Sequence, residues 1–279
     1  MIKIVSDTTS SIPISEATQM GIPLLPQIII FDGKEYRDDY ELDTPTFLTL
    51  LKAAEKLPKT SAPSPELYEP IFSELLADGH HVIIICPSAE VSGTVRSAFN
   101  AAQEYDQSRI TVLDTRSIGS GMGRYVMDAH AAAQDGATLE QIETMVADLS
   151  RRERIYFLVD TLEYLHKGGR IGGAQALIGG ILQVKPILTF RNGRVEPFES
   201  QRTKHKALAR LKEIVISECP HNDKAWLSIM HCDADLESNE LAKYFQESMG
   251  LSRVIIRQVP PAIVVHAGPG VIGVSFFVD

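Results

Sequence analysis

A short aliphatic run that ends in hydroxyl side chains is the feature that most constrains the fold of this chain. Residues 82–87 are continuously apolar, and the loop that follows carries Ser88, Ser92 and Thr94. The helical sequence 95–102 comes directly afterwards. An aliphatic run of this length is typical of a strand in a parallel sheet that helices cover on both faces. The hydroxyls and the free N–H groups at the start of the helix predict a site for a small anionic group.

The same alternation of strand and helix extends over the first 160 residues. Strands are expected at 2–6, 24–31, 34–36, 81–86, 109–113 and 155–159. Helices are expected at 13–20, 44–57, 65–77, 93–105, 119–133 and 139–152. This order predicts an α/β domain over residues 1–160, with a mostly parallel sheet and helices on both of its faces.

Polar side chains follow several of these strands at the point where each strand ends. They lie at 6–9, at Ser88 and at 114–117. Because the carboxyl ends of parallel strands meet at one edge of a sheet, hydroxyls and carboxylates are expected to gather there. The segment 59–64 is a similar polar loop in front of a helix. Its Ser64 serves as a helix cap, whereas Thr60 and Ser61 are not needed for capping.

The pattern changes after about residue 160, which predicts a second domain of α+β character over residues 161–279. Asn192-Gly193 joins the expected strands 184–190 and 194–199 in a hairpin, because Asn-Gly suits a type I′ turn. Helices at 203–217 and 237–248 and strands at 224–231, 253–259 and 271–278 are expected to follow.

Charge and composition limit the classes of partner. The net charge of −9 over 279 residues argues against nucleic acid as the main partner. Residues 151–212 nevertheless hold 13 Lys or Arg against 5 Asp or Glu. This basic segment is either a surface for an anionic ligand or acidic partner, or a set of solvated helix faces, and both interpretations stay open.

The chain is expected to be soluble and cytoplasmic, without an integral membrane segment. No apolar run approaches the roughly 20 residues of a membrane span, and no signal-peptide pattern precedes the first strand. The three cysteines form no even disulfide framework. Cys219, His221, His231 and Cys232 do not have the spacing of a zinc site, so the cysteines are expected to be small buried hydrophobes and no metal is expected.

Two further motifs lie in the second half of the chain. Gly168-Gly169 precedes Arg170 and frees the backbone to take positive φ. On the residues alone, a helix C-cap followed by an ordinary surface arginine is the favoured interpretation. His266 follows the apolar run 262–265 and precedes a Gly-Pro-Gly turn, where the expectation is a strand that gives way to a loop. A histidine there is more often structural than catalytic.

A serine esterase or thioesterase is the alternative of a different class. Ser92 and His266 would act with Asp7 or Asp114 as a triad. Ser92 lacks the Gly-x-Ser-x-Gly elbow of many such enzymes. The chain also lacks a phosphate-binding Gly-x-x-x-x-Gly-Lys motif, so ATP chemistry by this chain alone is not expected.

Six motifs together resemble the DegV family of bacterial fatty-acid-binding proteins, and they span nearly the whole chain. They are Val-Ser-Asp-Thr-Thr at 5–9, Lys-Thr-Ser-Ala-Pro at 59–63, Ser-x-x-x-Ser-Gly-Thr at 88–94, Leu-Glu-Tyr-Leu-His-Lys-Gly-Gly-Arg at 162–170, Lys-Pro-Ile-Leu at 185–188 and His-x-Gly-Pro-Gly at 266–270. Two positions depart from the family pattern: the first motif reads Ser-Asp-Thr-Thr, and Ala267 stands where Thr is common.

The resemblance implies a two-domain carrier that binds one long-chain fatty acid between its domains and needs no cofactor. Thr60, Ser61 and Ser92 would hold the carboxylate together with Gly93, and His266 and Arg202 would lie nearby. Such a protein would present the carboxylate to a separate ATP-binding fatty acid kinase subunit. The acyl phosphate formed there would serve phospholipid synthesis. Arg170 would lie in the region that faces the kinase, and the chain itself would not be an enzyme.

Overall fold

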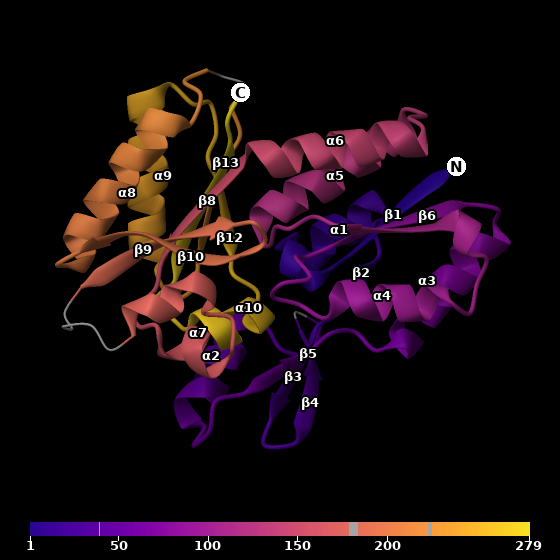
Figure 1. The fold of residues 1–279 in the computed structure, drawn as a ribbon, viewed down its shortest axis with the longest axis horizontal. Helices are drawn as coiled ribbons and strands as arrows, with labels where there is room; N and C mark the ends of the chain where they lie inside the picture. The colour runs from indigo at the N-terminus through magenta and orange to yellow at the C-terminus, as the bar shows by residue number, and fades with distance from the viewer. Residues whose placement is uncertain (39, 179–183, 223–224) are drawn as a thin grey trace. The chain divides into compact units, whose positions relative to one another are not determined.

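The computed structural model describes residues 1–38, 40–178, 184–222 and 225–279 (Figure 1). Its contacts divide the chain into two compact units. Unit 1 comprises Met1–Arg151 and Pro260–Ala262, and unit 2 comprises Arg152–Val259 and Ile263–Asp279. Lys224, the first residue of the strand expected at 224–231, lies outside the described residues. No helix in the described part of the chain has the length and apolar character needed to cross a membrane.

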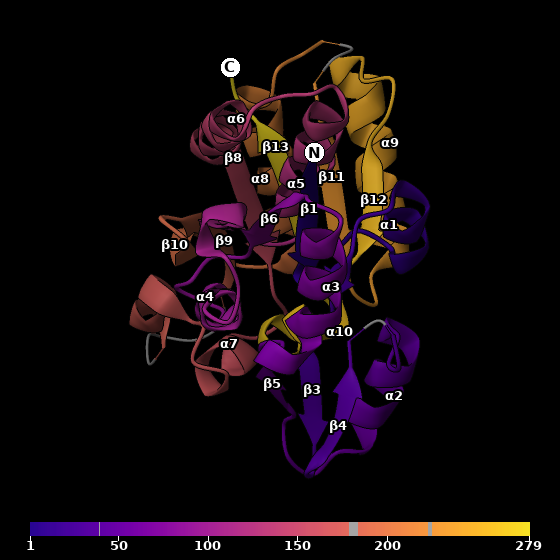
Figure 2. The ribbon, with the colours of Figure 1, turned by 90° about the vertical axis from the view of Figure 1, so that its right-hand side faces the viewer.

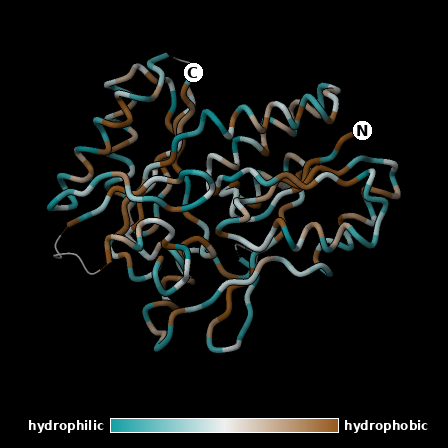
Figure 3. Tube along the Cα trace, in the orientation of Figure 1, coloured by the Kyte–Doolittle hydropathy of each residue, from teal (hydrophilic) through white to brown (hydrophobic). Residues whose placement is uncertain are grey.

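Unit 1 is built on a four-stranded sheet in which all neighbouring strands are parallel. Its order is β2-β1-β6-β7, with β1 at Ile2–Asp7, β2 at Leu24–Leu25, β6 at His81–Cys86 and β7 at Ile110–Asp114. Every residue of β6 after His81 is buried, and Figure 3 shows the hydrophobic character of the sheet's strands. The continuous aliphatic run of β6 therefore marks a strand that is covered on both faces, as predicted.

Helices cover both faces of this sheet (Figures 1 and 2). On one face lie α3 (Pro65–Ala77) and α4 (Thr94–Ala102), and on the other lies α5 (Ser120–Gln134) with α6 (Leu139–Arg152) beside it. Tyr68 and Phe72 of α3 are fully buried in the cluster formed with β6 and α4. The short helix α1 (Ile14–Met20) and the 3-10 turns η1 (Thr8–Ser10) and η2 (Gln107–Arg109) complete this part.

A second, smaller sheet of unit 1 changes two expectations. Its order is β4-β3-β5, with β3 at Ile28–Phe31, β4 at Lys34–Arg37 and β5 at Lys59–Ser61, and both pairings are antiparallel. The strand expected at 24–31 is divided between two sheets, because Pro26 has no N–H to give to a ladder. The polar loop expected at 59–64 begins as a strand. Helix α2 spans Thr44–Ala53 and is shorter than expected.

Unit 2 contains a mixed six-stranded sheet of order β10-β9-β8-β13-β11-β12. The strands are β8 (Glu153–Leu158), β9 (Lys185–Arg191), β10 (Arg194–Gln201), β11 (Leu227–His231), β12 (Ile255–Gln258) and β13 (Ile272–Phe277). Of their pairings, only β11 with β12 is parallel. Helices α8 (Lys204–Glu218) and α9 (Asp235–Met249) pack on this sheet around Leu211 and Phe245. The fold is thus α/β with a parallel sheet, plus a second unit with a mixed sheet, as predicted.

The hairpin of unit 2 forms as its sequence predicts, whereas β8 pairs with other strands than predicted. Asn192 and Gly193 both have positive φ, 52° and 80°, as a type I′ turn requires. The strand expected at 155–159 was placed in the parallel sheet of the first domain. It is β8, which pairs antiparallel with β9 and β13 in unit 2. An apolar run signals burial on both faces, but it does not identify the strand's neighbours.

The apolar run 262–265 is helical rather than extended. Helix α10 spans Pro261–Ala267, and two short elements, α7 (Glu163–Lys167) and η3 (Gly172–Leu177), were also not anticipated. Proline at the first position of α10 has the φ that a helix needs. The Ala262 N–H donates to the buried carboxylate of Asp38 at 3.2 Å, which caps the helix start. These two local effects override the strand preference of Ile263, Val264 and Val265.

Candidate functional site

The polar groups at the carboxyl edge of the parallel sheet come together as predicted. Ser6 Oγ of β1 donates to the Ile85 carbonyl of β6 at 2.7 Å, and Thr115 Oγ1, after β7, donates to the Cys86 carbonyl at 2.8 Å. The Ser88 N–H donates to the Ser117 carbonyl at 2.8 Å. The hydroxyls of Ser6 and Thr115 therefore hold strand ends and loops to one another.

Ser92 lies in a different environment, in the loop that leads into α4. Its side chain is half-buried, its Oγ lies 2.9 Å from Thr94 Oγ1, and it accepts from the Thr94 N–H at 3.2 Å. Gly93 is the N-cap residue of α4 and contributes no side chain to the cap. Free N–H groups at the start of α4 and the helix dipole favour a negative charge next to Ser92.

The segment after β5 lies against this loop. A Cβ placed on Gly93 would be 3.5 Å from Ala62 Cβ, and Ser97 Oγ of α4 donates to the Pro63 carbonyl. Thr60 is half-buried, whereas Ser61 is exposed and donates to the Ala62 carbonyl at 3.2 Å. Successive strand residues point to opposite faces, so Thr60 and Ser61 do not present their hydroxyls in the same direction.

A buried carboxylate behind Ser92 was not anticipated as part of a binding site. Asp7, at the end of β1, is 1% exposed and accepts four hydrogen bonds. Its Oδ1 accepts from the N–H and the hydroxyl of Thr9. Its Oδ2 accepts from Gln27 Nε2 at 2.7 Å and from Thr94 Oγ1 at 3.0 Å. Thr94 therefore links Asp7 to Ser92. The sequence pointed to Asp7 as a polar residue at the end of the first strand, as part of the motif at 5–9 and as a possible triad member, but not as a hydrogen-bonding partner of Thr94.

Burial dominates the electrostatics of Asp7. Desolvation raises the pKa of this carboxyl to about 6, although the hydrogen bonds from Thr9, Thr94 and Gln27 lower it. Asp7 therefore titrates close to neutral pH, where an ordinary Asp is fully ionised.

In unit 2, the motifs at 162–170 and 266–270 pack against each other through glycines. A Cβ on Gly168 would be 2.3 Å from His266 Nδ1, and a Cβ on Gly268 would be 2.5 Å from the Tyr164 ring. A Cβ on Gly270 would be 2.1 Å from the Asp160 carboxylate. Gly169 takes a positive φ of 70°, as expected. Gly168, the C-cap residue of α7, has an ordinary φ of −78°. Gly168 instead makes room for the imidazole.

His266 and Arg170 are neighbours in this packed region. Burial and, to a lesser extent, the charge of Arg170 lower the pKa of His266 to about 4. The imidazole is therefore neutral at neutral pH. Arg170 is half-buried and donates to the Gly168 carbonyl at 2.8 Å, so it is not an ordinary surface arginine. Arg202 is exposed in the turn between β10 and α8.

Several cations of the basic segment are used in ion pairs. Arg210 pairs with Glu199 at 2.8 Å and with Glu213 at 2.8 Å. Lys204 lies 3.6 Å from Asp160 and 3.5 Å from Glu237. Part of the local excess of positive charge is thus balanced by acidic neighbours on unit 2.

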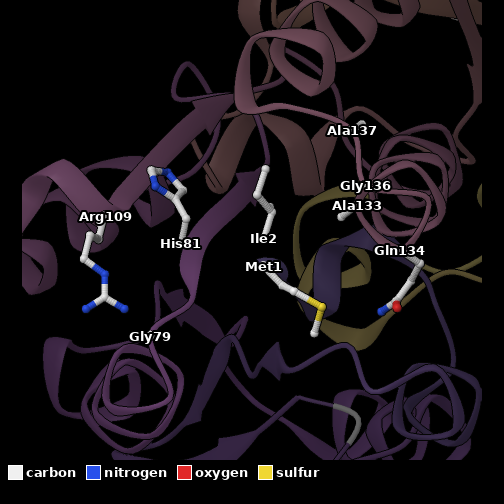
Figure 4. Close-up of a pocket in the computed structure, with 9 residues that line it drawn as sticks. All are labelled: Met1, Ile2, Gly79, His81, Arg109, Ala133, Gln134, Gly136 and Ala137. Atoms are coloured by element: carbon white, nitrogen blue, oxygen red, sulfur yellow. The ribbon is translucent and has the colours of Figure 1, made fainter.

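A surface hollow of about 460 Å³ lies at the other end of the parallel sheet, where β1 and β6 begin. Figure 4 shows His81 and Arg109 on one side of it and Gln134 on the other. The Arg109 guanidinium donates to the carbonyls of Leu76 and His80, and His81 Nε2 lies 2.9 Å from Thr111 Oγ1. The side chains of His81 and Arg109 thus have partners within the protein, which argues against an anion site in this hollow.

Among the described residues, no group of three or more His, Cys, Asp or Glu side chains is arranged to hold a metal ion. Cys86, Cys219 and Cys232 are free and buried, and burial raises the pKa of all three thiols. They behave as the small hydrophobes that the sequence predicts.

The local chemistry does not support the esterase alternative. The side-chain neighbour of the Ser92 hydroxyl is the hydroxyl of Thr94, which is no base. An activated serine needs a base that accepts its proton. A histidine with a pKa of about 4 binds a proton too weakly to serve well in this role.

Comparison with known proteins assigns the chain to a family. A family model described as "Uncharacterised protein, DegV family" matches residues 1–279. A DegV domain-containing protein of Caldanaerobacter subterraneus is 34% identical, over 99% of this chain and 98% of that protein. The chain belongs to the DegV family, as its motifs had indicated.

Two solved structures share the fold over the full chain. One is described as "Fatty Acid Binding of a DegV family Protein from Thermus thermophilus". Its TM-score is 0.91 at 30% identity, and the match covers 100% of this chain and 99% of that one. The other is described as DegV, a fatty acid binding protein from Bacillus subtilis. Its TM-score is 0.88 at 30% identity, and the match has the same coverage.

The elevated pKa of Asp7 predicts how stability depends on pH. The folded carboxyl binds a proton with a pKa of about 6, against 3.8 for the ordinary group, so its contribution to stability grows as pH falls through 6. Between pH 7.5 and 5.0, Asp7 should add about 1 kcal/mol to the free energy of unfolding. Urea unfolding of the wild type and of Asp7→Asn at both pH values measures this difference.

The matched control is Asp43→Asn, which alters the exposed N-cap of α2. Hydrogen bonds from Thr46 lower the pKa of Asp43, so its charge does not change over the same pH interval. The difference between wild type and Asp43→Asn should therefore be the same at pH 7.5 and 5.0. An equally flat difference for Asp7→Asn would contradict the assigned pKa.

Proposed function

We propose that this chain binds one long-chain fatty acid through its carboxylate at the Ser92-Gly93-Thr94 loop and carries it without altering it. The main support comes from the two solved structures that match the full chain, since both are described as fatty acid binding proteins. The loop supports the same function, because it combines a half-buried hydroxyl with the start of a helix.

The chemistry of the loop suits a carboxylate at the end of an apolar chain. A buried carboxylate must be hydrogen-bonded, since its desolvation otherwise prevents binding. Ser92 Oγ and the first N–H groups of α4 supply donors without a permanent charge. Thr60 is a better candidate than Ser61 for a further donor, because it is half-buried. It lies in β5, and the segment that follows β5 contacts Gly93. Ser61 was expected to share this role, and because its side chain is exposed we propose that it lies at the rim of the site.

Gly93 provides independent support for a ligand at this loop. Its φ of −81° suits any residue, and a Cβ there would meet only ordinary van der Waals neighbours. The fold therefore does not require glycine at this position. A close approach of the ligand to the backbone is a reason to have no side chain there.

His266 and Arg202 are proposed to act on the head group from unit 2, and the lipid's location between the two domains remains a prediction. A neutral imidazole such as that of His266 donates one hydrogen bond and adds no charge. The exposed Arg202 is suited to balance the charge of an acyl phosphate at the protein surface.

We further propose that the bound carboxylate is presented to a separate ATP-binding kinase subunit, which forms an acyl phosphate for phospholipid synthesis. The chain has no phosphate-binding Gly-x-x-x-x-Gly-Lys motif of its own, and the proposal therefore assigns the phosphoryl donor to a partner. The three unpaired, buried cysteines support a reducing, cytoplasmic location for this exchange.

Mass spectrometry of an organic extract of the purified protein tests the lipid. The wild type should yield one saturated or unsaturated C16–C18 acid per chain, and Ser92→Ala should lose most of it because a carboxylate donor is removed. Absence of lipid from the wild type, together with no uptake of added hexadecanoate, would refute the carrier function. Ester hydrolysis that disappears in Ser92→Ala would favour the esterase instead.

Gly93→Ala separates binding from folding. The folded structure has space for the methyl group, so the free energy of unfolding should change by less than about 1 kcal/mol. Hexadecanoate affinity should fall at least tenfold, since the methyl group occupies the approach to the first turn of α4. Gly168→Ala is the contrasting variant, because its methyl group would collide with the His266 imidazole and lower stability. Unchanged affinity in Gly93→Ala would show that the ligand does not approach the backbone there.

The docking role of Arg170 predicts that Arg170→Glu keeps its lipid but activates the kinase subunit less. Lipid content and acyl phosphate formation are measured on the same preparation. Arg170→Gln is the control for the electrostatic effect on His266, since it removes the positive charge without adding a negative one. Kinase activity equal to that of the wild type in both variants would exclude Arg170 from docking.

A further inference from the structure

The hydrogen bonds around Asp7 determine which way the Ser92 hydroxyl points. Two donors reach Oδ1 of Asp7, both from Thr9, and two reach Oδ2, from Gln27 and Thr94. An ionised carboxylate has about four positions for such donors, and all are filled. The surroundings of Asp7 thus match its ionised form.

The single proton of the Thr94 hydroxyl is then committed to Asp7. Thr94 Oγ1 also accepts from Gln27 Nε2 at 2.8 Å, which leaves it one further acceptor position. Ser92 Oγ, 2.9 Å away, must be the donor in its contact with Thr94. With Asp7 ionised, the proton of Ser92 therefore points inward, and a lone pair of Ser92 faces an incoming ligand.

The same network accommodates the opposite direction. When Oδ2 of Asp7 carries a proton, it donates to Thr94 Oγ1, which donates to Ser92 Oγ, and the proton of Ser92 becomes available to a ligand. Gln27 Nε2 still has acceptors on both Thr94 Oγ1 and Asp7 Oδ2. No donor in the network then lacks an acceptor, so the reversal breaks no hydrogen bond inside the protein.

We propose that Asp7, Thr94 and Gln27 are positioning residues for the Ser92 hydroxyl, and that binding of an ionised fatty acid is accompanied by the uptake of one proton from solvent. This inference rests on the proposed fatty acid binding at Ser92. The proton is held between the two carboxyl groups, through the hydroxyls of Thr94 and Ser92. Asp7 and the ligand together then carry one negative charge, and only O–H bonds are exchanged.

Repulsion between carboxylates is the physical reason for the uptake. Two negative charges linked by two hydroxyls in a buried region oppose each other, and such pairs retain a proton. Asp7 is prepared for this role, because burial has already raised its pKa to about 6 in the absence of a ligand. A carboxyl with the usual pKa of 3.8 would resist protonation at neutral pH far more strongly.

Other titratable groups around β1 do not replace Asp7 in this role. Burial and nearby negative charge raise the pKa of Cys86 on β6 and of Tyr68 on α3, so both are neutral at pH 7. Asp38 accepts from Thr8 Oγ1 at 2.9 Å and from the Ala262 N–H. The surrounding elements carry further charged or titratable groups: Asp114 at the end of β7, Arg96 beside Gly93 on α4, the Arg124–Asp128 pair on α5, and His130 of α5 with Lys3 of β1. Glu66, Glu69 and Glu74 lie on α3, and His81 lies at the start of β6.

Calorimetry of hexadecanoate binding, at submicellar concentration and in buffers of different ionisation enthalpy, measures the proton uptake directly. At pH 7.5 the wild type should take up close to one proton per lipid. Its affinity should fall about tenfold from pH 7.5 to 8.5, because each bound lipid needs one proton. Asp7→Asn should bind without uptake and with an affinity that does not depend on pH in this range.

Two further comparisons separate proton transfer along Asp7, Thr94 and Ser92, which we call the relay, from a structural effect of the substitutions. Thr94→Ser keeps the hydroxyl and should keep both the uptake and the pH dependence, whereas Thr94→Val should lose both. His266→Gln tests the other titratable group of the proposed site: whatever its effect on affinity, the number of protons taken up per bound lipid should stay the same. These variants also decide the question if Asp7→Asn does not fold.

The outcomes distinguish this inference from the function on which it rests. If the wild type binds no hexadecanoate at any pH, the proposed function fails. If the wild type binds through Ser92 but takes up no proton, the function stands and the relay is wrong. Uptake that persists in Thr94→Val, or that disappears in His266→Gln, likewise overturns the relay.

Discussion

The carboxylate of Asp7 is the interaction on which the architecture of unit 1 depends. It joins the end of β1 to η1 through Thr9, to the connection between β2 and β3 through Gln27, and to the start of α4 through Thr94. A buried carboxylate is costly unless such donors surround it. The four hydrogen bonds therefore hold three separate segments of the chain in register, and Ser92 takes its position from the last of them.

The sequence predicted the elements of this site better than the contacts between them. Runs rich in aliphatic residues identified β1, β6 and β7, and the geometry of parallel strands then placed their polar ends at one edge. The contact between Asp7 and Thr94 joins residues 87 positions apart. A single sequence contains no periodicity that specifies such a pair, so Asp7 could be named as a polar strand end, a motif residue and a possible triad member, but its partner Thr94 could not be predicted.

The errors have a common physical origin, which is that local preference does not determine partners. The run 262–265 is rich in β-branched residues, yet Pro261 and the Asp38 carboxylate start a helix there. The apolar run at β8 correctly signalled a buried strand, but its neighbours are β9 and β13 of the other unit. Thr60 and Ser61 seemed equivalent as loop residues, and pairing of β5 with β3 turns them in opposite directions.

The glycines of the family motifs differ in what they do, and the structure separates them. Gly168, Gly268 and Gly270 are each required by a close neighbour within unit 2, namely an imidazole, an aromatic ring and a carboxylate. Those motifs are therefore largely explained by packing, with His266 as a side chain that the packing holds in place. Gly93 has no comparable neighbour and an ordinary φ. The fold therefore does not need a glycine at position 93. Gly93 lies beside the Ser92 hydroxyl, whose direction depends on the buried Asp7 carboxylate. A ligand at this loop explains the glycine more readily than stability does.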